Sequence, residues 1–240
     1  MDNTIKIVSL GPGDPQMITL KGLQTLQKAH KIFSPVTRSK AGKEISRSAE
    51  ILTALGIEQS NIESYYLPMS TNRERTLEIY KEVANNCIEH YNNGKEVVIT
   101  AEGDGGFYSS SHYIQDMITD MGYRVERIAG VPAFIDCASL AGMHVASGER
   151  PLEIIPYVES AERILERIKP SAKYRANLVL MKLSQSESVI KEAIKEASNT
   201  VKFHYIENRG RADEFYTSNI ETILERKFPY FSILIIEGDF

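Results

Sequence analysis

Two glycine-rich turns carry the most distinctive chemistry of this 240-residue chain. The turn Gly11-Pro12-Gly13-Asp14-Pro15 directly follows the apolar run 5–10, and Glu102-Gly103-Asp104-Gly105-Gly106-Phe107-Tyr108 directly follows the buried-looking run 96–101. Glycines let a ligand approach the backbone closely, and ligands of open α/β sheets lie beyond the carboxyl ends of the strands. We therefore expect both turns to border one ligand cleft.

Both turns also have plain structural interpretations. The first could simply join a strand to a helix, because Gly and Pro mark turns in many folds. In the second, Ser109 or Ser110 could cap the following helix, which explains the serines but not the double glycine. The first turn is not a dinucleotide-binding fingerprint, because its third glycine is missing and the next helix begins late, near Thr19.

Three further stretches could contact a ligand. They are Gly130-Val131-Pro132-Ala133 at a predicted helix start, Leu180-Met181-Lys182 at a strand end, and Pro229-Tyr230-Phe231-Ser232 before the last strand. A Met at such a position more often fills the core. None of these stretches supplies a nucleophile–base pair, a hydrolase elbow or a Walker motif. The sequence favours a reaction in which the protein positions the reactants and the ligand carries the chemistry.

Composition excludes several classes of protein. Lys and Arg number 28 and Asp and Glu number 32, so a net charge of −4 disfavours a general grip on nucleic acid. No apolar run approaches the roughly 20 residues that cross a membrane, and the first residues are expected to enter a strand without a signal peptide. Five scattered histidines match no metal-site spacing, so no protein-bound metal is expected. Two cysteines without a Cys-x-x-Cys pair suit a reduced cytoplasm.

Strand-like and helix-like periodicity alternate in the first half. Strands are expected at 5–10, 32–34 (stopped by Pro35), 96–101 and 124–127, and helices after Thr19 and at 41–55, 72–91 and 109–121. This alternation predicts a parallel sheet flanked by helices. In the second half strands dominate, at 152–156, 176–182, 201–206, 214–217 and 231–236, with helices at 132–140 and 186–197. We therefore expect an N-terminal α/β lobe, residues 1–121, and a mixed α/β lobe, residues 122–240.

Together, these five motifs resemble the tetrapyrrole methylase family, the S-adenosylmethionine-dependent methyltransferases of cobalamin and sirohaem synthesis. The opening signature 8–15 with 18–21, the loop 102–109 and the turn 130–133 carry the resemblance. Within the family, the stretches 67–70, 178–182 and 229–234 are most similar to precorrin-2 C20-methyltransferases. The resemblance implies two α/β lobes with the cofactor cleft between them, and methyl transfer to C20 of precorrin-2 or cobalt-precorrin-2.

The same resemblance implies roles for residues. The cofactor would be S-adenosylmethionine, with S-adenosylhomocysteine as its product. Its pocket would be lined by Pro12, Gly103, Asp104, Phe107, Pro132, Ala133 and Met181. Tyr108, Asp14 and Tyr230 are candidates, by position only, for accepting a proton from the acceptor carbon. One departure from the family is Gly105, where a proline is usual. A more flexible loop at this point would cost cofactor affinity through ordering entropy.

The substrate implied by the resemblance carries eight carboxylates, so local cations must hold it although the chain is acidic. Arg38, Lys40, Lys43 and Arg47 cluster after the second predicted strand, and Arg209 and Met69 are further candidates for substrate contact. Any one of these cations could equally be a solvated surface charge. By resemblance, we expect a homodimer. The charge balance and the lack of a long apolar run predict that it binds neither nucleic acid nor a membrane.

Other functions stay open at this point. A relative acting on another corrinoid carbon, or a non-catalytic S-adenosylmethionine-binding protein with an altered loop at Gly105, would share the same motifs. The family also includes a diphthamide-pathway methyltransferase and a ribosomal-RNA ribose methyltransferase, which the acidic balance disfavours. A nicotinamide oxidoreductase is remote, because the acidic ribose ligand on a second strand is missing.

Replacing Arg38 by Ala should weaken tetrapyrrole binding, because a guanidinium binds a carboxylate well. Cofactor binding should stay intact, because the residues predicted to bind the cofactor lie in the glycine turns and do not include Arg38. Titration of each ligand into the variant measures both effects. Unchanged tetrapyrrole affinity would remove Arg38 from the substrate site.

Overall fold

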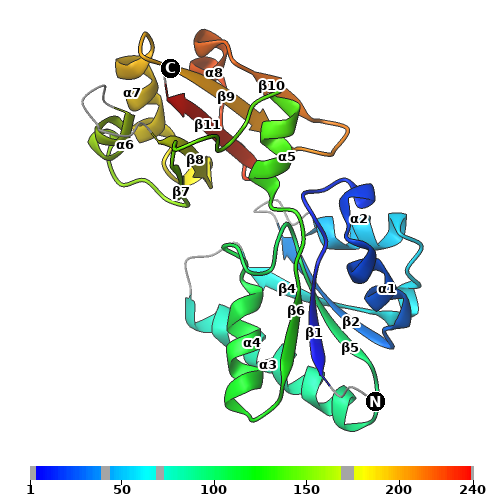
Figure 1. Ribbon diagram of the computed structural model, residues 1–240. Helices are drawn as coiled ribbons and strands as arrows, with labels where there is room; N and C mark the ends of the chain where they lie inside the picture. The colour runs from blue at the N-terminus through cyan, green and yellow to red at the C-terminus, as the bar shows by residue number, and fades with distance from the viewer. Residues whose placement is uncertain (1–3, 39–43, 69–72, 169–175, 239–240) are drawn as a thin grey trace. The chain divides into compact units, whose positions relative to one another are not determined.

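The chain forms two compact units, Met1–Ala133 and Phe134–Phe240, each with its own sheet and its own core (Figure 1). The structure, a computed structural model, describes residues 4–38, 44–68, 73–168 and 176–238. The division falls later than the expected boundary at 121/122. The reason is that strand β6 (Val125–Ile128) pairs with β1 (Ile5–Ser9) and so completes the first sheet.

The first sheet has the order β3-β2-β5-β1-β6, and β4 pairs with β2. Strands β1, β2 (Lys31–Arg38), β4 (Ile62–Pro68), β5 (Val97–Ala101) and β6 are parallel. Only the short β3 (Glu44–Ile45) runs antiparallel to its neighbour. The predicted parallel sheet is therefore confirmed, with one short antiparallel addition.

Helices cover both faces of this sheet. Helices α1 (Leu20–Lys28) and α2 (Arg47–Ala54) lie on one face, and α3 (Arg73–Asn92) and α4 (Ser111–Asp120) lie on the other (Figure 1). Ile5 and Ile7 of β1 pack toward α3 and α4, while Val8 packs toward α1 and α2. Burial on both faces explains why the strands are continuous apolar runs.

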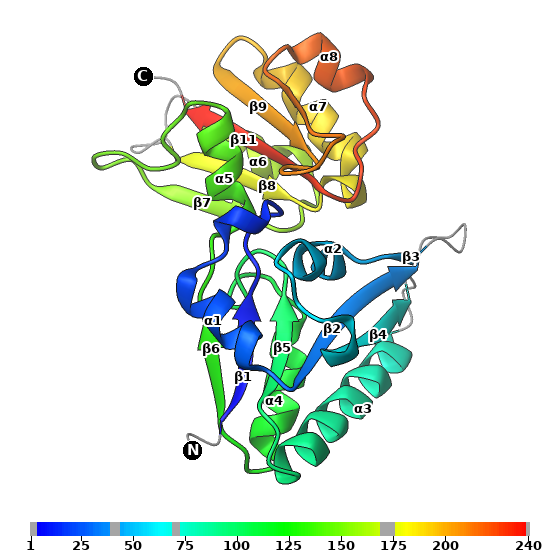
Figure 2. The ribbon, with the colours of Figure 1, turned by 90° about the vertical axis from the view of Figure 1, so that its right-hand side faces the viewer.

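Several local expectations need correction. Pro35 does not stop the second strand, which lies between β5 and β4 in the sheet (Figure 2). On the β4 edge the pairing continues through Pro35, which stands opposite Tyr65. On the other edge Pro35 lies after the β5 pairing ends at Phe33 and before the β3 pairing begins at Thr37, and its carbonyl accepts the Ser46 hydroxyl at 2.9 Å, so a missing N–H is tolerated at this interruption. The helix expected at 41–55 begins at Arg47, where Ser46 caps it by accepting the Ala49 N–H. Strand β4 was not anticipated. The cap at Thr19, which accepts the Gly22 N–H, is confirmed.

The second sheet is mixed, as expected, with the order β10-β9-β11-β8-β7. Strands β7 (Leu152–Ile155) and β8 (Asn177–Met181) are parallel. Strands β9 (Val201–Glu207), β10 (Phe215–Thr217) and β11 (Ser232–Gly238) form the antiparallel pairs.

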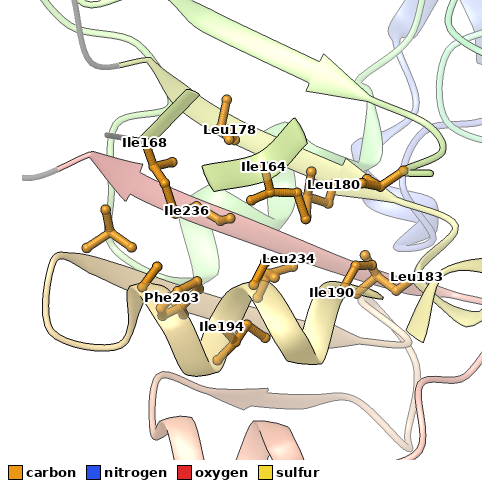
Figure 3. Packing of buried hydrophobic residues seen from close by; sticks show 14 of the residues in the cluster. Ile164, Ile168, Leu178, Leu180, Leu183, Ile190, Ile194, Phe203, Leu234 and Ile236 are labelled. Atoms are coloured by element: carbon orange, nitrogen blue, oxygen red, sulfur yellow. The ribbon is translucent and has the colours of Figure 1, made fainter. Parts of the chain in front are cut away.

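Alternate residues of the second sheet divide between its two faces. Leu178, Leu180, Leu234 and Ile236 join one core with the helices α6 (Ala161–Ile168), α7 (Glu187–Ala197) and α8 (Ile220–Glu225) (Figure 3). Helix α5 (Ala133–Leu140), with its buried Cys137, lies on the other face. Helices α6 and α8 were not predicted. The other cysteine, Cys87, is buried in the core of the first unit.

A buried ionic network fixes the end of β9. The Arg226 guanidinium donates to both carboxylate oxygens of Glu207, at 2.6 and 2.7 Å, and the Tyr205 hydroxyl donates to Oε1 at 2.6 Å. Burial alone would raise the pKa of Glu207, but the hydrogen bonds from Arg226 and Tyr205 outweigh it and lower the pKa. The network thereby holds the chain where it leaves β9 toward the loop 208–214.

Arg226→Gln should lower the free energy of unfolding by about 1–3 kcal/mol at pH 7, because it leaves a buried carboxylate without two of its hydrogen-bond donors. A carboxyl whose folded pKa is lowered stabilises the fold above its unfolded pKa and loses that contribution as the pH falls through the folded value. The difference between variant and wild type should therefore shrink below about pH 4.5. Urea denaturation across pH measures it.

Arg167→Gln is the matched control, because its partner Glu153 is far more exposed than Glu207 (40% against 6% for the side chains). We expect its cost to stay under about 1 kcal/mol. A loss in Arg226→Gln that is constant from pH 7 to pH 3 would contradict the ionic explanation.

Candidate functional site

The two glycine turns pair directly with each other at the carboxyl ends of β1 and β5. The Gly11 N–H donates to the Gly103 carbonyl at 3.1 Å, and the Gly103 N–H donates to the Gly11 carbonyl at 2.8 Å. Both residues have left-handed φ angles, +81° and +64°. Glycine adopts such angles without steric cost. The expectation that the turns border a common site therefore has a geometric basis.

The Asp104 carboxylate joins the third turn to the second. Its Oδ1 accepts the Gly106 N–H at 2.8 Å, within its own loop, and its Oδ2 accepts the Gly130 N–H at 2.7 Å, after β6. An ionised carboxylate only accepts hydrogen bonds, and two amide donors suit its two oxygens. One side chain thus fixes the relative positions of the loops that follow β5 and β6.

Gly130 shows how closely these turns approach. A Cβ at this position would stand 2.6 Å from the Ser9 Cβ and 2.9 Å from the Gly103 carbonyl oxygen. Both distances are shorter than van der Waals contact, and the carbonyl belongs to a paired backbone that cannot move freely. Only glycine is compatible with the junction of the three turns.

Gly105 is held in place, contrary to the expectation of a looser loop. The residue is buried, and its N–H donates to the Ser9 hydroxyl at 2.9 Å. A Cβ here would lie 3.1 Å from Ile7 Cγ2 and 3.3 Å from the Ala101 Cβ. A proline at this position could not make the bond to Ser9, since it lacks the N–H. Where the family usually has the rigid ring of a proline, this chain has a glycine whose position is restrained by the hydrogen bond to Ser9.

The predicted cofactor residues fall into two groups. Pro12, Gly103, Asp104, Phe107, Pro132 and Ala133 all belong to the first unit, in the loops after β1, β5 and β6. The Ala133 nitrogen lies 3.8 Å from the position of a Cβ at Gly103, so the third turn flanks the second. Met181 belongs to the second unit, as the last residue of β8. Contact of these residues with a cofactor stays a prediction.

The three candidates for proton transfer differ in surroundings. The Asp14 carboxylate accepts the Gln16 N–H at 2.9 Å and caps the short 3-10 helix Pro15–Met17, which is a structural role. Tyr108 is 49% exposed, has a left-handed φ of +49° and packs edge-on against Phe107. Tyr230, in the second unit, is 52% exposed and packs against Phe231.

The predicted substrate contacts are only partly accessible to description. The backbone of Arg38 ends β2, paired with Glu44 and Pro68 at the carboxyl edge of the sheet. Lys40 and Met69 lie outside the described residues, as does Lys43. Arg209 holds its own loop, because its guanidinium donates to the buried Asp136 at 2.9 Å and to Glu214 at 2.5 Å. Its assignment to the substrate stays a prediction that this geometry does not favour.

Arg209, Met181 and Tyr230 nevertheless share one edge of the second sheet. Strands β8 and β9 end at the edge where the antiparallel β11 begins. The Asn208 N–H donates to the Phe231 carbonyl at 2.9 Å, which ties the loop after β9 to the start of β11.

A buried polar cluster beside the first turn has no local signal in the sequence. Arg47, named above among the candidate cations for the substrate, is only 6% exposed and donates to the Pro12 carbonyl at 3.4 Å. The Ser48 hydroxyl donates to Glu102 at 3.4 Å. Burial raises the pKa of the Glu102 carboxyl, although the Arg47 charge and Ser48 oppose the shift. The cluster braces the first and second turns from the side of α2.

Two other kinds of site find no support among the described residues. No helix among them is long and apolar enough to cross a membrane. No group of three or more His, Cys, Asp or Glu side chains in the described ranges could hold a metal ion.

Comparison with known proteins identifies the family. The model of the tetrapyrrole (corrin/porphyrin) methylases matches residues 4–224, so the chain belongs to this family. A probable cobalt-precorrin-2 C(20)-methyltransferase of Methanocaldococcus jannaschii is 29% identical over 187 residues, which are 77% of this chain and 75% of that protein. A precorrin-2 C(20)-methyltransferase of a Sinorhizobium species is 24% identical over 239 residues, 96% of this chain and 94% of that protein.

A solved structure shares the fold. Uroporphyrin-III C-methyltransferase from Thermus thermophilus, complexed with S-adenosylhomocysteine, superposes with a TM-score of 0.65. The superposition covers 98% of this chain and 97% of that one, at 14% sequence identity. The predicted fold class, two α/β lobes of the tetrapyrrole methylase type, is confirmed.

Asp104→Asn tests the junction. The amide nitrogen that replaces one oxygen would face either the Gly106 or the Gly130 N–H, so one hydrogen bond is lost. We expect the free energy of unfolding to fall by about 1–3 kcal/mol and the affinity for S-adenosylhomocysteine to weaken, measured by urea denaturation and calorimetry. The control is Asp116→Asn on the exposed face of α4. Equal behaviour of the two variants would show that Asp104 does not hold the loops.

Proposed function

We propose that this chain transfers a methyl group from S-adenosylmethionine to C20 of precorrin-2 or cobalt-precorrin-2. The observation that carries the proposal is the junction of three glycine turns at the carboxyl edge of a parallel sheet, in a member of the tetrapyrrole methylase family. Relatives named for C20 methylation match three-quarters or more of the chain. The stretches 67–70, 178–182 and 229–234, which resemble those of precorrin-2 C20-methyltransferases, also support this choice of substrate.

The residues present fit the cofactor. At Gly103 a Cβ would meet only the Ala133 nitrogen within 4 Å, so the backbone has an open side where a ligand can lie against it. Pro12, Phe107 and Ala133 add apolar contact beside the backbone groups of the same loops. Such a mixture of apolar surface and backbone suits an adenosyl group, which needs flat contact and a few hydrogen bonds.

When bound, S-adenosylmethionine supplies an electrophilic methyl group on its sulfonium. The work left to the chain is to hold the acceptor carbon in line with that methyl group, at about 3–3.5 Å. The hydrogen bonds of Asp104 and the bridge between Gly11 and Gly103 preset the loops for this task, so little ordering is needed on binding. A cofactor bound by such rigid loops would be held in one orientation.

A proton must also leave the acceptor carbon as the new bond forms. Of the three candidates, Tyr108 has an exposed hydroxyl-bearing ring in the second turn itself. The Asp14 carboxylate already accepts a backbone N–H. Tyr230 opens the last strand of the second unit. We propose Tyr108 as the first of these to test, with solvent water as the alternative acceptor.

Two finer points complete the proposal. The tetrapyrrole carboxylates would be held by cations at the carboxyl edge of the first sheet, where β2 ends at Arg38. By family resemblance, the protein would act as a cytoplasmic homodimer.

A second candidate function is methylation of another tetrapyrrole carbon. The Thermus thermophilus protein that shares the fold is a uroporphyrin-III methyltransferase, so the same architecture serves another acceptor. A non-catalytic cofactor-binding role was tied to Gly105, but that residue is held by Ser9 and packed against Ile7. The structural reason for lost turnover is therefore weaker than the sequence suggested.

The deciding experiment is a methyl-transfer assay under anaerobic conditions. Labelled S-adenosylmethionine is incubated with metal-free precorrin-2 and, separately, with its cobalt complex. We expect label at C20, with the faster substrate identifying the route. Label at another carbon would support the second candidate, and cofactor binding without transfer to either substrate would favour the non-catalytic role.

A further inference from the structure

A pocket of about 350 Å³ opens beside the second glycine turn, within the first unit. Residues 105–109 of the turn line it together with His112 from the first turn of α4 and Arg127 from β6. None of the predicted catalytic or substrate roles uses His112 or Arg127. Two nitrogen-bearing side chains and an aromatic loop thus line one pocket.

Arg127 is an exposed cation that lacks a carboxylate partner within the described part of the chain. The acidic side chains beside it, Glu126 in the sequence and Asp104 in the fold, already accept other hydrogen bonds. The Glu126 carboxylate accepts from Lys21 at 2.6 Å, and both oxygens of Asp104 accept backbone N–H groups. A guanidinium with open donors is a ready partner for a carboxylate, which it can bind in a two-point fork.

Gly106 lies beside this guanidinium. A Cβ at Gly106 would stand 3.0 Å from Arg127 Nη1 and also 3.0 Å from Asp104 Oδ1. The absence of a side chain leaves room for both groups against the loop. The second glycine of the pair, which helix capping did not explain, therefore borders the cation of this pocket.

His112 presents its second nitrogen for binding. Its Nδ1 lies 2.7 Å from the Ser109 carbonyl oxygen. Because a carbonyl can only accept, this contact requires Nδ1 to carry the proton and donate. Nε2 has no hydrogen-bond partner in the described ranges. The ring is held by Tyr113, with centroids 3.9 Å apart. A fixed imidazole therefore lines the same pocket as the unpaired guanidinium.

The walls of the pocket select for an apolar stem. Phe107 and Tyr108 pack edge to face at 4.8 Å between centroids. Tyr108 holds a left-handed backbone conformation with φ +49°. Such a conformation costs energy in a non-glycine residue and is typical of functional loops. A pocket lined by two aromatic rings and a cation fits an aliphatic chain that ends in a negative charge.

We propose that this pocket binds a carboxylate on a short aliphatic stem, through Arg127 and His112. The inference rests on the proposed function, because the tetrapyrrole acceptor carries eight such groups. The amino-acid end of the cofactor carries one as well. Both sources share the chemistry that Arg127 recognises, and the experiment separates them.

The test compares Arg127→Ala and Arg127→Lys with the matched control Arg124→Ala, an exposed arginine that precedes the same strand and does not line the pocket. Tetrapyrrole affinity is measured by fluorescence quenching, and KM by methyl transfer. We expect Arg127→Ala to weaken tetrapyrrole binding about 10-fold with kcat little changed. The lysine variant should fall between Arg127→Ala and wild type. The thermal unfolding midpoint should not change, because the side chain is exposed.

Cofactor binding forms the second arm, with S-adenosylhomocysteine and 5′-methylthioadenosine, which lacks the carboxylate. A loss confined to S-adenosylhomocysteine in Arg127→Ala would support the pocket but assign it to the cofactor. Equal behaviour of Arg127→Ala and Arg124→Ala toward all ligands would overturn the inference. Failure of wild-type methyl transfer would count against the proposed function alone, since the binding arms do not depend on turnover.

Discussion

The site depends on one carboxylate that accepts hydrogen bonds from two loops. Asp104 accepts the N–H of Gly106 in its own turn and that of Gly130 in the next turn. Gly11 and Gly103 pair with each other just beyond the ends of the neighbouring strands β1 and β5. These contacts bring three strand ends so close that no side chain fits at Gly130. The surface offered to a ligand is then mostly backbone, whose position is set before anything binds.

The second unit applies a related principle at one edge of its sheet. Lys182 follows β8 and Asn208 follows β9, and both have left-handed φ angles, as does Tyr108 in the first unit. These are the three non-glycine residues with positive φ in the described ranges. Such conformations persist only where surrounding contacts over-determine them. The Glu207–Arg226 pair and the Asp136–Arg209–Glu214 group supply those contacts around Asn208.

Sequence periodicity predicted the two α/β units and most of their strands, because both faces of each sheet are buried and the strands are therefore apolar runs. It missed β4, whose residues Glu63, Ser64 and Tyr66 interrupt the apolar pattern. Pro35 misled the prediction because a strand can continue through a proline that lies where no ladder on one edge needs its N–H. Pro35 lies between the β5 and β3 pairings on one edge of β2 and opposite β4 on the other, which only the tertiary fold determines. The sequence places Arg47 among the candidate cations for the substrate, because Glu102, the carboxyl that its charge faces in the fold, lies far along the sequence. Tertiary partners of this kind leave no local signal.

The burial of both thiols has a practical consequence for chemistry on this protein. Cys87 and Cys137 are 0% and 2% exposed and lie in different units. Burial raises the pKa of the Cys87 thiol well above its usual value, so the reactive thiolate is scarce. Alkylating reagents and mild oxidants should therefore leave both thiols of the folded chain unmodified. A cysteine engineered at an exposed position would therefore be the one thiol that takes a fluorescent or spin label, in whichever unit it is placed.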